Sequence, residues 1–423
     1  MTTVHEIEKD GKGSNPLFII PLFFMSILLH QSSVIFGVNF SLADFFCFFL
    51  FLILMMWNQF YIPIQSMLFF ILVFIVVLVS AVFFVPIIFS YTPEPTRIIS
   101  DFMKLLAIFL YFLVGYNLLR MGKITISIKW YSIIGLIIGL IGVLFTLLNI
   151  RLFSSVLFFL DIRFKGFMND PNYFSVLQVT ALVYFTRVKT IPLRFKYFAI
   201  LILILSVLVS GSKTGIITLF SYFFIRIIEY TLISKEKKTK KIILQLSLIF
   251  ALLAIAFIII RGFPTLLNML SSAVPAFSRI EPLFTDFDEA ISGNGSDRAD
   301  TWKVAYLIIQ HSPLIGTGIG SYTHIAAETF YYNNVAHNTF LQITAEWGIP
   351  LAVLFFTFIG RLIVKSSNSR KSNFEMNYIL RDILIILLIG SMAISLNNAR
   401  VLWLVIGALL SSLGKKQTQR SLK

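Results

Sequence analysis

Long apolar runs, each about as long as a membrane-spanning helix, recur along almost the whole 423-residue chain. The runs at 66–89 and 130–150 reach the ~20 residues that a helix needs to cross the hydrocarbon core. A helix satisfies its backbone polar groups within the segment, and no alternating strand pattern competes with it. Charged residues make up only 13% of the chain, against roughly 25% in soluble domains. The sequence therefore predicts an all-α, polytopic membrane helical bundle.

We expect about twelve transmembrane helices and one large extracytoplasmic loop. The spans are expected at 16–30, 40–57, 65–90, 98–119, 129–149, 172–187, 197–210, 215–233, 242–261, 339–364, 378–396 and 398–413. The chain is then a tail at 1–15, a bundle at 16–261, a loop at 262–338, a second part of the bundle at 339–413 and a tail at 414–423. The polar start lacks a basic n-region, so the first apolar run is read as a span, not as a signal peptide.

The net charge of +15 comes from basic residues that crowd into one set of short connections. Twenty basic residues lie in the connections around 120–129, 187–196, 235–241 and 365–381 and in the C-terminal tail. Ten lie on the other side: Arg97, Arg151, Arg163, Lys165, Lys213, Arg261, Arg279, Arg298, Lys303 and Arg400. By the positive-inside rule both termini are cytoplasmic, and 262–338 lies outside. The basic balance therefore has a topological origin, and no nucleic-acid partner is expected.

Other site classes find little support in the sequence. Cys47 is the only cysteine, so no intramolecular disulfide can form. No GxxxxGK[ST] phosphate loop is present. The Gly316-x-Gly318-x-Gly320 run is not a dinucleotide fingerprint, since no strand precedes it; we expect a flexible turn there. Candidate metal ligands in the loop have no metal-binding spacing, and we expect neither a metal nor a cofactor: His311, His324, Glu328 and His337.

The loop at 262–338 contains enough aromatic and aliphatic residues to pack onto the bundle, so we expect it to be ordered and functional. Asp297 is a candidate cap for a helix that starts at Arg298 and ends before Pro313. Trp302, Ala305, Tyr306 and Ile309 fall on one face of that helix. Asn338 is a plausible cap for the tenth span, which places His337 at the mouth of a helix, at the membrane surface.

The order of these elements is more specific than any one of them. Arg298-x-x-x-Trp302 is followed by Ser312-Pro-Leu-Ile-Gly-Thr-Gly318 and then by His337-Asn-x-x-Leu-x-x-x-x-Glu346-x-Gly-Ile349. This order resembles the Wzy_C signature of the O-antigen ligase and polymerase superfamily. Gly166-Phe-Met-Asn-Asp-Pro-Asn172 and Ser210-Gly-Ser-Lys-Thr-Gly215 resemble two further motifs of that family, although Lys213 stands where arginine is usual. The resemblance covers about a third of the chain and implies a GT-C-like membrane glycosyltransferase.

The resemblance implies transfer of a glycan from a polyprenyl (undecaprenyl) pyrophosphate carrier to an acceptor hydroxyl, on the outer face of the bacterial inner membrane. The charge that develops on the pyrophosphate needs preorganised cations, and the guanidinium fork fits phosphate oxygens. Arg298 is the first candidate for this clamp, and His337 is the candidate base for the acceptor hydroxyl. Lys213 is the second clamp candidate, with Arg400 and Arg163 as helpers; Arg400 could instead anchor the last helix, and Arg163 could meet lipid headgroups.

Three polar residues near the motifs have open roles. Glu346 could orient a partner or pair with a basic residue, and Asp170 and Asn172 could bind sugar hydroxyls or cap the sixth span. The motifs do not separate a polymerase from a ligase; a polymerase is favoured, because Val335 stands where many ligases place a further histidine. A flippase or transporter is the alternative from another class, with Asp101 and Lys104 as a possible ion path. The expected partners are the lipid-linked glycan and membrane lipid, with a chain-length regulator left open.

Overall fold

The computed structural model describes residues 15–32, 41–57, 60–233, 271, 274–285, 298–367 and 374–418. Helices dominate these residues, and the strands among them are only the short antiparallel pair β1 and β2. In chain order the first elements are α1 (Pro16–Leu28), α2 (Leu42–Met56), α3 (Ile64–Val79), η2 (Ser80–Phe84), α4 (Val85–Phe89), α5 (Pro95–Arg120), α6 (Ile124–Leu147), α7 (Ser154–Leu157), β1 (Phe158–Phe159), β2 (Arg163–Phe164), α8 (Pro171–Arg187) and α9 (Leu193–Val209). They are followed by α10 (Lys213–Ile233), η3 (Pro275–Arg279), α12 (Pro282–Thr285), α14 (Arg298–His311), α15 (Tyr322–Phe330), α16 (Thr339–Trp347), α17 (Ile349–Ser367), α18 (Phe374–Gly390) and α19 (Arg400–Thr418).

Four described helices have both the length and the apolar composition needed to cross a membrane: the α3–α4 stretch at 64–89, α5, α6 and α17. Three shorter apolar helices lie at Pro16–Leu28, Leu42–Met56 and Arg400–Leu413. The predicted all-α class is thus confirmed, whereas the number of twelve spans stays a prediction. The expected span at 242–261, the cap Asp297 and most of the predicted loop before Arg298 lie outside the described residues.

α8 is the central helix of one half of the bundle, where it packs against α6, α9, α10 and α18. Nearly all of its side chains are buried, including the polar Ser175, Gln178 and Thr180. In the other half, α5 and α19 pack closely because glycines face the partner backbone: a Cβ on Gly407 would lie 1.9 Å from the Phe112 carbonyl oxygen. Small residues allow membrane helices this close approach. The close packing of α5 on α19 therefore fixes the spacing of these two helices.

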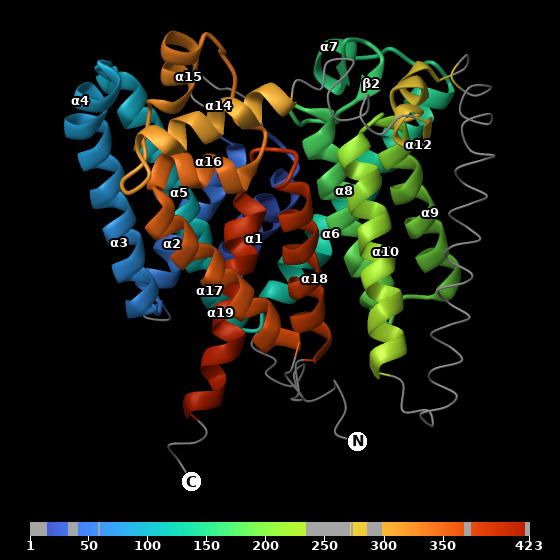
Figure 1. Ribbon diagram of the computed structural model, residues 1–423. Coiled ribbons are helices and arrows are strands. Elements are labelled where there is room, and N and C mark those ends of the chain that lie inside the picture. The colour runs from blue at the N-terminus through green and yellow to red at the C-terminus, as the bar shows by residue number, and fades with distance from the viewer. Residues whose placement is uncertain are drawn as a thin grey trace.

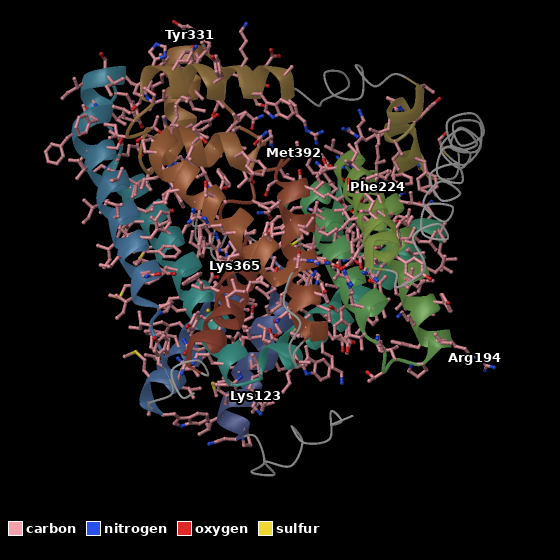
Figure 2. The ribbon with its side chains drawn as sticks, turned by 60° about the horizontal axis from the view of Figure 1, so that its bottom comes forward. Lys123, Arg194, Phe224, Tyr331, Lys365 and Met392 are labelled. Carbon is pink, nitrogen blue, oxygen red and sulfur yellow. The ribbon has the colours of Figure 1, made fainter. Side chains whose placement is uncertain are left out.

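The connections and short elements gather at one end of the bundle, which we call the loop face. Figure 1 shows α7, β2, α14 and α15 at this end and the C-terminal end of α19 at the other. In Figure 2, Tyr331 lies at the loop face, while Lys123 and Arg194 lie at the opposite end. Basic residues of two predicted cytoplasmic connections thus lie away from the segment that follows Arg298.

An ion network joins three helices in the half that contains α8. Arg187 of α8 donates to Asp382 of α18 at 2.7 Å and also pairs with Glu229 of α10. Arg381 donates to Glu229 at 2.9 Å, and Arg226 pairs with the same carboxylate at 2.6 Å. These pairs fix the register of α10, whose first residue is Lys213, against α8 and α18.

The expected tenth span at 339–364 is wrong in one respect, since it is two helices. α16 ends at Trp347 and α17 begins at Ile349, and Gly348 between them has a φ of +80°. A Cβ at Gly348 would lie 2.3 Å from the Leu314 carbonyl oxygen, so the break is held by packing. Only α17 has the length and composition of a span, and α16 is a separate helix that packs against α14.

The Gly316–Gly320 turn is packed, contrary to the flexibility expected of it. All three glycines have positive φ, and a Cβ on Gly318 would lie 2.2 Å from the Val77 carbonyl oxygen. Ser80 donates to the Gly316 carbonyl at 2.6 Å, and Gly318 N–H donates to the Glu346 carbonyl at 2.9 Å. The π-helical turn η2 lies where this loop contacts the α3–α4 stretch.

The prediction of a helix from Arg298 to before Pro313 is confirmed by α14, which ends at His311. The face predicted for it is only partly right. Ala305 and Ile309 are buried, together with Thr301, Val304 and Ile308, but Tyr306 is exposed. The buried stripe is therefore rotated toward Thr301, because α14 lies between α15 and α16.

Candidate functional site

Two arginines from distant parts of the sequence are held by the turn that precedes α10. Arg163 of β2 is 6% exposed; its Nε donates to the Ser210 carbonyl at 2.9 Å and its Nη2 to Asn172 Oδ1 at 3.1 Å. Arg298, the first residue of α14, donates from Nη2 to Thr214 Oγ1 at 3.0 Å. Buried Lys213 directly precedes Thr214. The structure thus brings three of the predicted clamp residues to one place: Arg163, Lys213 and Arg298.

A fourth basic residue, Arg279, completes this group. The pKa of Arg163 is lowered to about 10, first by burial and then by the nearby positive charges of Arg279 and Arg298, while Asp170 opposes the shift. Burial also lowers the pKa of Arg298, with Asp170 opposing this and Arg279 adding to it. We call Arg163, Lys213, Arg279 and Arg298 the cation cluster. Asp170 is the carboxylate whose charge acts on Arg163 and Arg298. A group of several basic side chains suits an anion.

Local hydrogen bonds explain why the cluster forms here. Asp170 caps α8 by accepting from the backbone N–H groups of Asn172 at 2.5 Å and Tyr173 at 3.1 Å. Asn172 Oδ1 accepts from Arg163 and also from Ser212 Oγ at 2.9 Å. Asp170 therefore has the predicted capping role, whereas Asn172 does not cap the helix and instead joins the α8 start to Arg163 and to the turn before α10.

Gly211 sets the position of Arg279. Its φ is +58°, and a Cβ there would lie 2.8 Å from the Ala276 carbonyl oxygen, so η3 packs directly on the turn. Arg279 is the last residue of η3. Nothing in the local sequence indicates that Arg279 belongs with Arg163, because this packing depends on contacts between residues far apart in the chain. The hydroxyls of Ser212 and Thr214, by contrast, lie inside the motif that sequence comparison already singles out.

Three helices start at the cation cluster, which adds to its positive potential. α10 begins at Lys213 and α14 at Arg298, while Asn172 is the second residue of α8. The helix dipoles favour an anion at this end, and at α8 the Asp170 carboxylate already accepts from the first N–H groups. The site is thus built from fixed side chains and fixed backbone dipoles.

His337 precedes α16 and is held by the backbone around it. Asn338 caps α16 by accepting from Phe340 N at 3.0 Å and Leu341 N at 3.2 Å, as predicted, and its Nδ2 donates to the Met392 carbonyl at 3.1 Å. His337 is half-buried and has a φ of +46°, a left-handed conformation that is uncommon for a residue with a side chain. Such strain persists where the surroundings fix it.

α14 and α16 bring Arg298 and His337 to the same end of a helix pair. The two helices pack together, and their C-terminal ends meet: Ile349 N–H donates to the Pro313 carbonyl at 2.8 Å and Thr317 N–H to the Ala345 carbonyl at 2.8 Å. They therefore run in the same direction. Arg298 and the residue before α16 both lie at the starts of this pair, and direct approach of the two side chains stays a prediction.

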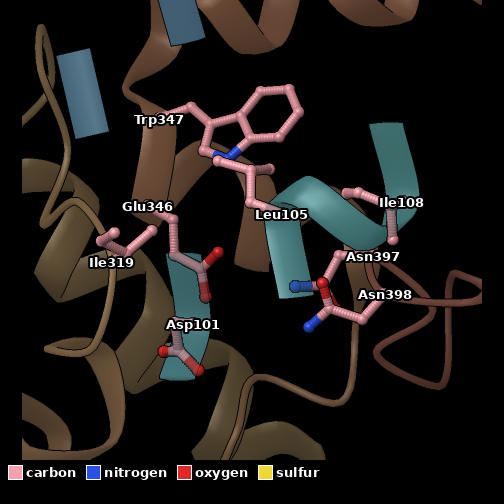
Figure 3. A pocket seen from close by; sticks show the side chains of 8 residues that line it. All are labelled: Asp101, Leu105, Ile108, Ile319, Glu346, Trp347, Asn397 and Asn398. Carbon is pink, nitrogen blue, oxygen red and sulfur yellow. The ribbon is translucent and has the colours of Figure 1, made fainter. Parts of the chain in front are cut away.

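Glu346 lies at the other end of α16, away from the cation cluster. It lines a cavity of about 40 Å³ with Asp101, Asn397 and Asn398, and Figure 3 shows the Glu346 and Asp101 carboxylates turned toward one another. Burial raises the pKa of Glu346 to about 8; Gln342 and Lys104 oppose this shift, and Asp101 supports it.

Glu346 is nevertheless connected to the peptide before His337. Gln342 Nε2 donates to Glu346 Oε1 at 2.5 Å, and Gln342 Oε1 accepts from Ala336 N–H at 3.0 Å. Gln342 thus links the Glu346 carboxyl to this peptide, and an orienting role for Glu346 stays a prediction.

Arg400 forms a two-pronged pair with Asp44 of α2 and does not reach the cluster through any described bond. Its Nε and Nη2 donate to the two carboxylate oxygens at 3.1 and 2.8 Å. The pair lies within electrostatic range of Tyr173 in the first turn of α8. This geometry favours the anchoring role for Arg400, since its fork is occupied by a residue that the sequence did not single out.

Part of the chain is similar to a known protein family. The sequence model of the Wzy_C family, described as O-Antigen ligase, matches residues 198–356. The chain carries a Wzy_C domain. No curated protein matches the chain. The Wzy_C match includes Lys213, Arg279, Arg298, His337 and Glu346, whereas Arg163 and the start of α8 come from the preceding part of the bundle.

The Wzy_C family supports an O-antigen ligase or polymerase type of function for a membrane protein, and implies a lipid-linked glycan as substrate. Among the described residues, no three His, Cys, Asp or Glu side chains gather in a way that could hold a metal ion.

Proposed function

We propose that the protein is a glycan polymerase that acts at the outer face of the bacterial inner membrane. It transfers an oligosaccharide chain from an undecaprenyl-type pyrophosphate carrier onto a hydroxyl of another lipid-linked repeat unit. The observation that carries this proposal is the cation cluster, in which the charge of Arg279 acts on the pKa of Arg163 and of Arg298, beside buried Lys213. Basic side chains held close together repel one another and favour an anion beside them, and a diphosphate is the anion that the family chemistry supplies.

The cation cluster stabilises the leaving group. As the bond between the anomeric carbon and the phosphate oxygen breaks, its electron pair passes to the pyrophosphate, whose charge increases. Arg163 and Arg298 are fixed by Asn172, Ser210 and Thr214, so little reorganisation is needed at that moment. The planar fork of each arginine can meet two phosphate oxygens, while Lys213 acts as a point charge.

His337 takes the proton of the acceptor hydroxyl while the hydroxyl oxygen forms its bond to the anomeric carbon. Neutral imidazole can accept this proton near pH 7. Asn338 and Gln342 fix the peptides on both sides of His337, and Glu346 positions Gln342. Glu346 is thus a positioning residue, and Asp170 and Asn172 hold the clamp and face the sugar next to it.

A ligase that transfers the glycan to lipid A–core is the second candidate, since it would use the same donor and the same clamp. A transporter has less support. Asp101 receives Lys104 Nζ at 2.6 Å and Gly320 N–H at 2.9 Å, so its carboxylate holds the glycine turn rather than standing open to an ion path.

We further propose that the protein is a multi-pass protein of the bacterial inner membrane, with both termini in the cytoplasm and the loop face outside. Lys123 and Arg194 at the opposite end support this orientation through the positive-inside rule. A chain-length regulator would be an additional partner on the loop-face side.

The proposed chemistry is tested by Arg298→Ala and His337→Ala in cells that lack the native gene. Each variant should abolish glycan extension while the protein still inserts. Lys303→Ala is the control, because Lys303 is an exposed basic residue of the same helix. Full-length polymer from both Arg298→Ala and His337→Ala would contradict the assignment.

Gene deletion distinguishes the candidate functions. A missing polymerase leaves single repeat units on lipid A–core, and a missing ligase leaves long chains on the carrier. A missing flippase traps single units at the cytoplasmic face. The first pattern is the one we expect.

A further inference from the structure

The connection between α6 and α8 exposes an unusual number of large apolar side chains. In residues 148–167 these include Ile150, Leu152, Phe153, Val156, Leu160 and Ile162. Phe153 is 67% and Leu160 73% exposed. We call this segment the apolar hairpin, because β1 and β2 pair within it. Figure 1 shows it at the loop face, above α8.

The apolar hairpin is a built structure. Arg151 donates to the Asp161 carbonyl at 2.5 Å and to Asn149 Oδ1 at 3.0 Å, and its guanidinium lies 5.1 Å from the centre of the Phe158 ring. Phe158 and Phe164 are buried beneath it. The exposed side chains are therefore held outward by a fixed scaffold.

The exposed face continues the surface of a membrane-spanning helix. α6 is long and apolar enough to cross a membrane, and its last turns expose Leu144 and Leu147. The apolar hairpin begins directly after Leu147, so its apolar surface starts where the lipid-facing surface of α6 ends. A contiguous apolar patch of this kind is a site for lipid or protein contact. Continuity with α6 favours lipid, and Arg151 and Lys165 supply the positive charge that suits headgroup phosphates.

The apolar hairpin is also directly connected to the cation cluster. Leu160 and Arg163 are only three residues apart. The Leu160 side chain is exposed, whereas Arg163 is buried and donates to Ser210 and Asn172. A single short turn thus separates the apolar surface from the anion site.

We propose that the apolar hairpin inserts its exposed side chains into the membrane leaflet on the loop-face side and so holds Arg163 at the depth of the headgroup phosphates. Insertion itself requires no glycan chemistry. Its consequence rests on the proposed function: the site then takes a diphosphate that is already anchored in that leaflet, and the lipid chain leaves the site past the hairpin.

The test measures the depth of single nitroxide labels in vesicles of phosphatidylethanolamine and phosphatidylglycerol. Cys47 is the chain's only cysteine and is buried, so Cys47→Ala gives a background for Phe153→Cys and Leu160→Cys. Tyr331→Cys is the control, because Tyr331 is 91% exposed at the loop face. Labels at 153 and 160 should collide more with oxygen than with a water-soluble nickel chelate, and the label at 331 should show the reverse.

Two results would overturn the proposal. Labels at 153 and 160 that are as open to the nickel chelate as the label at 331 would place the hairpin in water. Labels shielded from both reagents would mean that protein covers it, as in contact with a second copy. The measurement needs neither donor nor acceptor, so full-length polymer in the Arg298→Ala test would contradict the proposed function and leave this result unaffected.

Discussion

Arginine and lysine contribute differently to the cation cluster, because only the guanidinium group can bind two phosphate oxygens while a third N–H holds a protein partner. Arg163 illustrates this, since Nε and Nη2 bind Ser210 and Asn172 and leave its other N–H groups for a ligand. Buried Lys213 adds charge without that geometry. Individual substitutions should therefore affect donor binding and chemistry to different extents.

Replacing Arg279 with alanine should weaken binding of the donor. Arg279 acts on Arg163 and Arg298 through charge, and its removal lowers the positive potential of the cation cluster. We expect kcat/KM to fall roughly 10- to 100-fold, about 1.4–3 kcal/mol, with Arg279→Lys restoring part of it. The measurement is steady-state glycan transfer with purified enzyme. Unchanged kinetics in Arg279→Ala would exclude Arg279 from the site.

Glu346 should make the stability of the protein depend on pH. Its pKa rises from 4.5 to about 8 on folding, so between these values the folded state binds more protons than the unfolded state. Stability therefore falls as pH rises through this window and levels off above about pH 8. Glu346→Gln should remove this slope and raise the Tm above pH 8, as measured by thermal unfolding in detergent. An identical pH profile in both proteins would contradict the buried, protonated carboxyl.

At the scale of elements, the glycine turn and the break at Gly348 fix α16, and α16 fixes the peptide at His337. The turn touches α3 through Val77, and its N–H groups bind the carbonyls at the end of α16. Asn338 and Thr339 hold the start of α16 against 391–396, where Thr339 Oγ1 donates to the Ile394 carbonyl at 2.8 Å. Both ends of α16 are thus anchored, and this keeps the backbone of His337, the residue two positions before the helix, in a fixed position.

A methyl group added at Gly318 should destabilise the protein strongly. The Cβ would lie 2.2 Å from a carbonyl oxygen of α3, at a φ of +66°. We expect Gly318→Ala to cost more than about 3 kcal/mol, because backbone must move in addition to the left-handed strain. Gly122→Ala has the strain alone and should cost about 1 kcal/mol, and Gly360→Ala, in open space within α17, should be neutral or stabilising. Equal Tm values for Gly318→Ala and Gly360→Ala would contradict the packed turn.

Apolar periodicity and helix caps predict the helices well where contacts with distant residues do not alter them. The apolar runs give α5, α6 and α8 to within a few residues, and Asn338 marks the start of α16. Periodicity alone could not reveal the break at Gly348, where the close contact is with the Leu314 carbonyl from another part of the chain. For the same reason the sequence indicates Arg298 and Lys213, which lie in motifs, but not Arg279 or the Asp44 partner of Arg400.

At the scale of the whole molecule, Asp44 and Arg400 join the second helix to the last one. Asp44 is buried and the Arg400 side chain is only 12% exposed, so each group depends on the other for compensation of its charge. Removing one partner, as in Arg400→Ala or Asp44→Ala, should cost about 3–5 kcal/mol, because a buried charge is left alone. The double variant should cost less than the sum of the two. Additive effects on the free energy of unfolding would show that the pair is not coupled.

The central claim is that the cation cluster holds a lipid-linked diphosphate beside His337. The most direct measurement is a structure of the protein in a lipid bilayer with an undecaprenyl diphosphate glycan bound. We predict diphosphate oxygens within about 3 Å of the guanidinium groups of Arg163 and Arg298, with the anomeric carbon facing His337. A diphosphate bound away from these arginines, or His337 remote from the anomeric carbon, would contradict the account.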